Sequence, residues 1–331
     1  MKKNYDFLGI GDTTVDAFIR VNQAEIRCDE KNEHCRLCLN FADKIPYEDV
    51  YIVSAVGNSA NAAVAASRLG LKSVLMTNLG GDNNGIDCIK AFQEENVGTQ
   101  FVAVNKTKKT NYHYVLWHKD DRTVLIKHEK YDYKLYDFDE PGWIYLSSLG
   151  ENSLAFHQKL EKFLNERPEI KLAFQPGTFQ MKFGKDALAG IYKRTDVFFC
   201  NKEESQKILK TDEDDIKKLL KAMSALGPKI VAITDGVKGA YSYDGKEILF
   251  MREYPDPKPP FERTGAGDAF SSTFAVALAL GKSVREAIMW APINSMSVVQ
   301  QIGARAGLLT RKELEEYLAK APADYEPKVI G

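Results

Sequence analysis

Residues 263–270 combine a glycine-rich turn with an acidic side chain, a combination that could support phosphoryl transfer. Gly265 and Gly267 flank one alanine, Asp268 follows, and an apolar stretch continues to Gly281. The stretch is long enough for about three helical turns, and its closing glycine is typical of a helix C-terminus. Unpaired backbone N–H groups at a helix start bind anions. Asp268 is then either a general base beside a phosphate site or the acidic first turn of a capped, buried helix.

A second group of polar side chains follows an expected first strand at residues 5–11 and begins an alanine-rich helix near residue 58. Carboxylates and amides there can hydrogen-bond the hydroxyl groups of a polyhydroxylated ligand, since ligands bind at the carboxyl edge of an open α/β sheet. For the two carboxylates, a solvated turn is the alternative. The candidates are Asp12, Asp16, Gly57, Asn58 and Asn61.

Asn201 and Glu204 stand where an expected strand at 196–201 passes into a helix. An amide and a carboxylate at a strand's end suit a Mg²⁺ shell that is held through water. A first helical turn that is simply rich in glutamate is the alternative interpretation.

Strands and helices alternate through most of the chain, for example over 73–95, 143–166 and 196–204. This alternation predicts an α/β fold built on a mostly parallel sheet. Residues 17–55 and 100–128 lack the helical pattern and predict small β elements outside that sheet, the second with a hairpin turn at 119–122. We see no domain-scale linker, so residues 1–331 are expected to form a single domain.

Composition excludes several classes of function. The chain has 45 basic and 46 acidic residues, which leaves no electrostatic footprint for nucleic acid. It has no apolar run near the ~20 residues that cross a bilayer. The N-terminus lacks a signal segment, and we expect a cytoplasmic location. Gly9 and Gly11 begin a dinucleotide-like pattern, but Thr14 replaces its third glycine, so a nicotinamide oxidoreductase is disfavoured.

The five cysteines are an odd number and thinly spread, which argues against a disulfide framework. Cys28, Cys35 and Cys38 resemble half a zinc site, but the chain has no second Cys-x-x-Cys pair. We therefore expect free thiols on an irregular segment.

Taken together, the motifs resemble those of the ribokinase-like (PfkB) family of carbohydrate and nucleoside kinases, over nearly the whole chain. The most specific match is Thr264-Gly265-Ala266-Gly267-Asp268-Ala269-Phe270. Supporting matches occur in the expected order: Gly11-Asp12 with Asp16, Gly57 with Asn61, Gly81-Asp82 with Gly85, Asn201 with Glu204, and Thr234 with Gly236 and Gly239.

The resemblance implies a doubly wound, mostly parallel sheet flanked by helices, with a small β-sheet lid formed by residues of about 17–55 and 100–128. It implies ATP and Mg²⁺ as cofactors, and homodimers formed through the lid. A monovalent cation such as K⁺ stays open, because Glu262 and Arg263 stand where the family usually has Asp and Thr.

By position, the resemblance implies that Asp268 is the general base. It also implies that the backbone N–H groups of Gly265, Ala266 and Gly267 bind the transferring phosphate. Asn201 and Glu204 would organise Mg²⁺ through water, without a direct metal ligand. The remaining expected roles are a nucleotide site at Thr234, Gly236, Gly239 and Asn294, and an acceptor site at Asp12, Asp16, Gly57, Asn58 and Asn61.

Three functions follow. The first is an ATP-dependent kinase acting on a hydroxymethyl group of a sugar. The second is a nucleoside kinase, in which Tyr112, Tyr114 and Trp117 of the hairpin stack on a base. The third is a catalytically silent sugar-binding regulator, which the intact Asp268 argues against.

Overall fold

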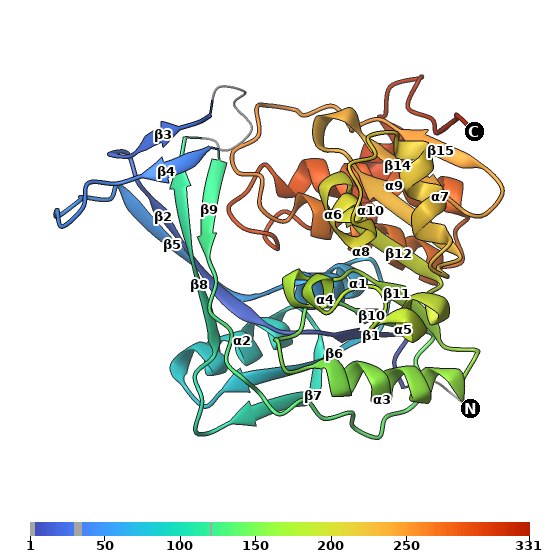
Figure 1. The fold of residues 1–331 in the computed structure, drawn as a ribbon, viewed down its shortest axis with the longest axis horizontal. Coiled ribbons are helices and arrows are strands. Elements are labelled where there is room, and N and C mark those ends of the chain that lie inside the picture. Colours follow the sequence, from blue (N-terminus) through green and yellow to red (C-terminus); the bar gives the residue numbers. More distant parts are fainter. Residues whose placement is uncertain (1–3, 30–34, 120) are drawn as a thin grey trace.

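A large central sheet, with a smaller sheet standing away from one end, organises the chain (Figure 1). The computed structural model describes residues 4–29, 35–119 and 121–331. The large sheet runs, in spatial order, through β16 (Lys328–Val329), β15 (Ile248–Met251), β14 (Ala240–Tyr243), β13 (Ile230–Thr234), β12 (Val197–Asn201), β11 (Lys171–Phe174), β10 (Trp143–Leu146), β1 (Phe7–Ile10), β6 (Ser73–Gly80) and β7 (Gly98–Asn105). Strands from β13 to β7 are parallel, and β14, β15 and β16 are antiparallel. The predicted doubly wound, mostly parallel α/β fold is confirmed.

Helices cover both faces because alternate strand residues point to opposite sides of the sheet. Leu8 and Ile10 of β1 belong to one buried cluster, and Phe7 belongs to another on the opposite face. The first face is covered by α3 (Leu154–Asn165), α4 (Thr178–Phe183), α5 (Ala189–Arg194), α6 (Lys202–Leu209) and α7 (Ile216–Ser224). The second is covered by α1 (Asn58–Arg68), α2 (Asn83–Glu94), α8 (Ala266–Ala279), α9 (Val284–Val298) and α10 (Arg311–Ala319).

The smaller sheet is the lid expected from the sequence. Its strands are ordered β5 (Asp49–Val56), β2 (Thr14–Arg20), β8 (Asn111–His118) and β9 (Asp121–Leu125). The expected lid segment 100–128 begins too early, because residues up to 105 pair with β6 in the large sheet. Residues 30–34 of the other lid segment, and residue 120 of the expected hairpin turn, lie outside the described residues.

Strand register gives the lid two unlike faces. Asp16 pairs with His113, and Phe18 with Val115, so these four side chains share the face that looks onto the large domain. Phe18 and Val115 are buried there. Tyr114 lies between His113 and Val115, so its side chain points to the outer face, where it is 49% exposed. The inner face of the lid therefore packs toward the large domain.

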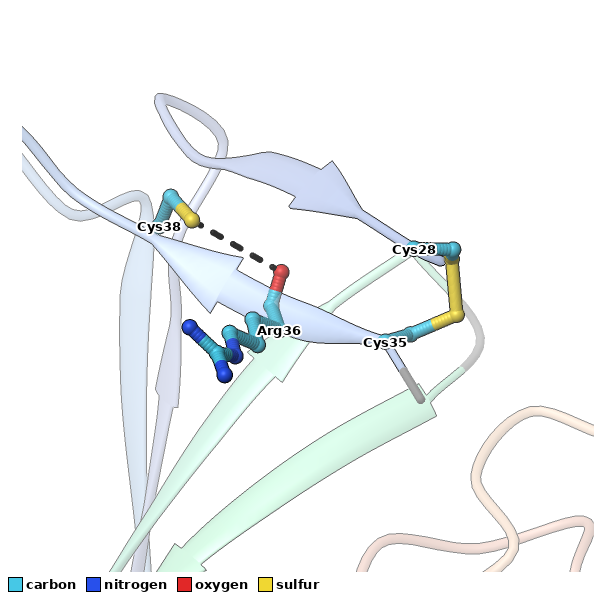
Figure 2. The surroundings of a disulfide bond; sticks show 4 residues. All are labelled: Cys28, Cys35, Arg36 and Cys38. Atoms are coloured by element: carbon cyan, nitrogen blue, oxygen red, sulfur yellow. Dashed lines mark hydrogen bonds between the residues drawn. A yellow bond between two sulfur atoms is a disulfide. The ribbon is translucent and has the colours of Figure 1, made fainter. Parts of the chain in front are cut away.

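A two-stranded ribbon extends from the lid and is closed by a disulfide between Cys28 and Cys35 (Figure 2). The prediction of free thiols is wrong for this pair. The strands β3 (Glu25–Arg27) and β4 (Arg36–Cys38) are antiparallel, with Arg27 opposite Arg36, so the residues just beyond them face each other. Cys38 stays free, with its thiol 3.9 Å from the carbonyl oxygen of Arg36.

Candidate active site

The turn at the start of α8 depends on Gly265. Its φ is +85°, in the left-handed region, and an added Cβ would lie 2.3 Å from the Cβ of Ala304. Only glycine fits such a position without strain. The N–H groups of Ala266 and Gly267 come next, and as the first in the helix they have no intrahelical partner. The turn therefore presents the positive end of the helix dipole.

Asp268, in the first turn of α8, is held by three side-chain amides. Asn58 and Asn61, both on α1, donate to Oδ1 at 2.8 Å and to Oδ2 at 2.9 Å, respectively. Gln175, which follows β11, donates its Nε2 to Oδ1 at 3.1 Å. Tyr145 of β10 in turn donates its hydroxyl to Oε1 of Gln175 at 2.6 Å, which fixes the amide's orientation. The carboxylate is thus fixed in direction by neighbouring elements.

Burial dominates the electrostatics of Asp268 and Glu204. The loss of water around Asp268 raises its pKa above the usual value; the three amide donors oppose this rise, and the charge of Asp16 adds to it. Burial also raises the pKa of Glu204, against the hydrogen bond from the Asn201 N–H, and the nearby Asp268 contributes to the increase. Such shifts are typical of functional carboxylates.

Asp268 lies between two cavities. One, of about 260 Å³, is lined by Ala266 and Gly267 of its own helix. The other, of about 230 Å³, is lined by Asn58 and Gln175, which donate to its carboxylate. We name them the donor pocket and the acceptor pocket.

The donor pocket has an apolar wall and a glycine-rich edge. Thr234, Gly236 and Gly239, predicted for the nucleotide, all line it. Its apolar lining includes Phe270, Pro292, Met296 and Val299. A flat aromatic base could lie against such a wall while phosphates point toward the start of α8.

Asn294 is not brought into the donor pocket, against the prediction. Its side chain is fully buried: Nδ2 donates to Thr273 Oγ1 at 2.8 Å, and Oδ1 accepts from the N–H of Leu309 at 2.9 Å. These two hydrogen bonds join α9 to α8 and to the loop that follows α9, which is a structural role.

Asn201 and Glu204 form a reciprocal cap at the start of α6. The Glu204 N–H donates to Asn201 Oδ1 at 2.8 Å, and the Asn201 N–H donates to Glu204 Oε2 at 2.9 Å. Glu204 also lines the acceptor pocket. The cap uses one carboxylate oxygen of Glu204 and leaves Oε1 for other contacts. Glu204 can therefore serve both as part of the first helical turn and as part of a Mg²⁺ shell that is held through water.

Asp12, Gly57 and Asn58 of the predicted acceptor site line the acceptor pocket. Asn58 and Asn61 both donate their amides to the carboxylate of Asp268. Asp12 contacts His128, with 3.1 Å between Oδ2 and Nδ1. Sequence reasoning missed four residues of this region, namely His113, His128, Tyr133 and Gln175.

The aromatic residues expected to stack on a base are not in the acceptor pocket. Tyr114 lies on the outer face of the lid, and Tyr112 shares its direction on β8, with the two rings 5.2 Å apart. Trp117 faces inward but packs edge-on against Phe261, with ring centres 5.2 Å apart. The aromatic ring that does line the pocket is Phe179 of α4.

Comparison with known proteins shows the family to which the chain belongs. The family model described as pfkB family carbohydrate kinase matches residues 24–311. The chain belongs to this family. It is 28% identical to a ribokinase of Bacillus subtilis over 284 residues, covering 80% of this chain and 87% of the relative.

Solved structures support the fold. A nucleoside kinase of Methanocaldococcus jannaschii superposes with a TM-score of 0.77 at 19% identity, covering 96% of this chain and 99% of the other. A ribokinase of Arabidopsis thaliana, complexed with ribose and ATP, gives 0.76 at 19% identity, over 95% and 98%.

This membership makes the chain a phosphotransferase with an alcohol group as acceptor, within a family of carbohydrate and nucleoside kinases. Among the described residues, no helix is long and apolar enough to cross a membrane.

Proposed function

We propose that this kinase transfers the γ-phosphate of ATP to a hydroxymethyl group of a sugar. The observation that carries the proposal is the place of Asp268, between a pocket edged by the glycine turn and a pocket lined with hydroxyl-binding groups. Asp268 takes the proton of the acceptor hydroxyl while its oxygen bonds to the γ-phosphorus and the bond to the β-phosphate oxygen breaks. The N–H groups of Gly265, Ala266 and Gly267 stabilise the charge on the transferring group.

The residues fit Mg²⁺ as a second cofactor. Burial raises the pKa values of Glu204 and Asp268, and the charge of Asp268 adds to the rise at Glu204, so a cation between the phosphates and Glu204 would be favourable. No cluster of three acidic, histidine or cysteine side chains suited to a metal occurs in the described part of the chain. A metal would therefore be held mainly by phosphates and water. When bound, Mg²⁺ neutralises charge on the β- and γ-phosphates.

The loop before the glycine turn does not fit a monovalent cation well. The carboxylate of Glu262 accepts from the N–H of Thr264 at 2.7 Å and lies 3.8 Å from Nε of Arg122. A cationic neighbour from the lid is thus already beside this buried acid. We propose that K⁺ is not required, and we derive no step through it.

A nucleoside acceptor is the second candidate, and one observation favours it. The lining of the acceptor pocket includes the apolar residues Ile126, Pro176, Phe179 and Met181, against which a base could pack. We also propose a homodimer formed through the exposed outer face of the lid, and a cytoplasmic location, where ATP is available.

Substrate-dependent ADP release over a panel of sugars and nucleosides tests the proposal. Activity with at least one acceptor should be lost by about 10²–10⁴-fold in Asp268→Asn, the usual contribution of a general base. Full activity in this variant would rule out the mechanism. Binding of acceptors with no turnover in the wild-type protein would instead support the silent regulator.

A further inference from the structure

Two aspartate–histidine pairs lie side by side, and Asp12 and both histidines line the acceptor pocket. Nδ1 of His128 lies 3.1 Å from Oδ2 of Asp12, and Nδ1 of His113 lies 3.3 Å from Oδ1 of Asp16. The two imidazole rings are 5.2 Å apart, and both line the pocket. One aspartate comes from the end of β1 and the other from β2, so the lid and the large domain each contribute to the arrangement.

Asp12 has little freedom to bind a substrate directly. Its side chain is only 2% exposed. The hydroxyl of Tyr133 donates to both of its oxygens, at 3.0 and 2.9 Å, and itself accepts from the N–H of Gly150 at 2.8 Å. His128 supplies the other contact. Asp12 thus acts through His128, whose ring it orients.

The direction of the hydrogen bond determines what His128 presents to the pocket. A carboxylate accepts and does not donate, so the proton lies on Nδ1. In the neutral ring Nε2 is then an acceptor. Among the described residues, Nε2 of His128 has no hydrogen-bond partner, and the His128 and Phe179 rings meet nearly at right angles with 5.5 Å between their centres.

His113 is held less firmly, because its Nδ1 is at ion-pair distance from Oδ1 of Asp16, and that oxygen makes no hydrogen bond in the described part of the protein. Nε2 of His113 is buried, and no hydrogen-bonding partner for it exists in the described part of the protein. Buried polar atoms of this kind are rare, because each costs free energy unless a partner is supplied. The hydroxyl of a bound acceptor is a partner of the right chemistry.

The charge of the pocket narrows the class of acceptor. Its described lining contains Asp12 and Glu204 but neither lysine nor arginine. Sugar phosphates are normally bound through such cations. A neutral polyhydroxylated acceptor is compatible with two imidazoles and two side-chain amides.

We propose that His113 and His128 are acceptor-binding, specificity-determining residues that each accept a hydrogen bond from one hydroxyl group of a neutral polyol. Asp12 positions the ring of His128, and Asp16 lies beside the ring of His113. The proposal rests on the proposed kinase function and specifies its substrate class: neutral sugars or nucleosides and not sugar phosphates.

Two substitutions at each histidine separate the ring's contacts. An asparagine amide reaches about as far as Nδ1 and keeps the contact with the aspartate, whereas a glutamine amide reaches about as far as Nε2. His113→Asn and His128→Asn should each raise the KM for the best acceptor by about tenfold, the upper range for one hydrogen bond, with the KM for ATP and kcat changed less than about twofold. The corresponding glutamine variants should recover part of the loss.

The panel contains D-ribose, D-fructose, cytidine and fructose 6-phosphate, together with deoxy forms of the best acceptor. A deoxy acceptor that lacks the contacted hydroxyl should have a raised KM with the wild-type enzyme. Its KM should not rise further with the matching asparagine variant, because the deoxy acceptor and the substitution remove the same hydrogen bond. Tyr47→Phe is the control, since it changes an aromatic residue that is 60% exposed and does not line the pocket. Thermal melting shows that each variant is folded.

The outcomes distinguish this inference from the kinase function itself. Wild-type activity on neutral acceptors with an unchanged KM in both asparagine variants would overturn the role of the histidines and leave the kinase standing. A preference for fructose 6-phosphate would overturn the substrate class. No transfer to any acceptor would contradict the proposed function.

Discussion

Asp268 depends on its neighbours for both direction and acidity. A general base must be deprotonated to work, and burial raises the pKa of this carboxyl above the usual value of about 3.9. We predict that kcat/KM falls as the pH is lowered through that raised pKa, and that it is level above it. A pH–rate profile of the wild-type enzyme at saturating ATP measures this limb. An acid limb at the pKa of an ordinary exposed aspartate would contradict the assignment.

The amide of Gln175 lowers the pKa of Asp268 by donating a hydrogen bond to its carboxylate. Because its hydrogen bond favours the charged carboxylate, Gln175→Leu should raise the pKa of Asp268 further and move the acid limb to higher pH. It should also lower kcat by about tenfold or more, as expected for a lost hydrogen bond to a charged group.

A merely structural role of Gln175 would not move the pH limb. Tyr145→Phe is the partner variant, since it removes the hydroxyl that orients Gln175 and leaves Asp268 itself untouched. A smaller shift in the same direction is expected. An unmoved limb in both variants would argue against coupling between Gln175 and the base.

At the scale of the element, the start of α8 offers two glycines with opposite surroundings. Gly265 has φ +85° and no room beside Ala304, whereas a Cβ on Gly267 would meet nothing within 4 Å. Gly265→Ala should destabilise the protein by about 1–3 kcal/mol, through strain, and reduce activity. Gly267→Ala should keep the melting temperature but narrow the donor pocket, which it lines.

Thermal melting and steady-state kinetics on the two variants check the contrast. A raised KM for ATP with normal stability is expected for Gly267→Ala alone. Equal destabilisation by both changes would show that the turn is not held by the contact with Ala304.

The lid is a second element whose role follows from its contacts. Trp117 is 2% exposed and packs on Phe261, directly before the loop that leads to the glycine turn. A seated lid excludes water, which competes with the acceptor for the phosphoryl group. Trp117→Ala should therefore increase ADP release without acceptor and lower the ratio of transfer to hydrolysis several-fold.

Product and ADP, measured together, give this ratio. Tyr47→Ala is a suitable control, because it removes an aromatic ring that is 60% exposed. An unchanged ratio in Trp117→Ala would mean that the lid does not control access of water.

Local signals explain which parts could be predicted from the sequence. The glycine turn, Asp268 and the strand–helix alternation are visible because each depends on residues close together in the chain. Gln175 was missed because its partner, Asp268, lies 93 residues away in the chain. The pairs Asp12–His128 and Asp16–His113 join positions about a hundred residues apart, and only the register of β2 with β8 brings the second together. The disulfide was missed for a different reason: the odd cysteine count argued against pairing, whereas the hairpin of β3 and β4 brings Cys28 and Cys35 together.

At the scale of the whole molecule, part of the outer face of the lid is exposed in the single chain, while Val15 and Tyr112 on the same face pack into a buried cluster. Ile52, Tyr114 and Leu125 are 62%, 49% and 52% exposed. They share one face, because Ala17 pairs with Ile52 on one side and with Tyr114 on the other, and Tyr114 pairs with Leu125. A contiguous apolar surface of this kind marks an association site. A second copy of the lid is the occupant that we propose, because an identical apolar face can cover it by two-fold symmetry.

If so, Ile52→Asp should convert a dimer into a monomer, because a charge at the centre of an apolar interface would be buried without a partner. Light scattering after size exclusion measures the mass of wild-type and variant protein, and Val237→Asp, at a residue 69% exposed outside the lid, is the matched control. A monomeric variant should also bind acceptor more weakly, since each lid would lose the support that holds it over its pocket. A monomeric wild-type protein, or an Ile52→Asp variant that stays dimeric, would show that the outer face has another use.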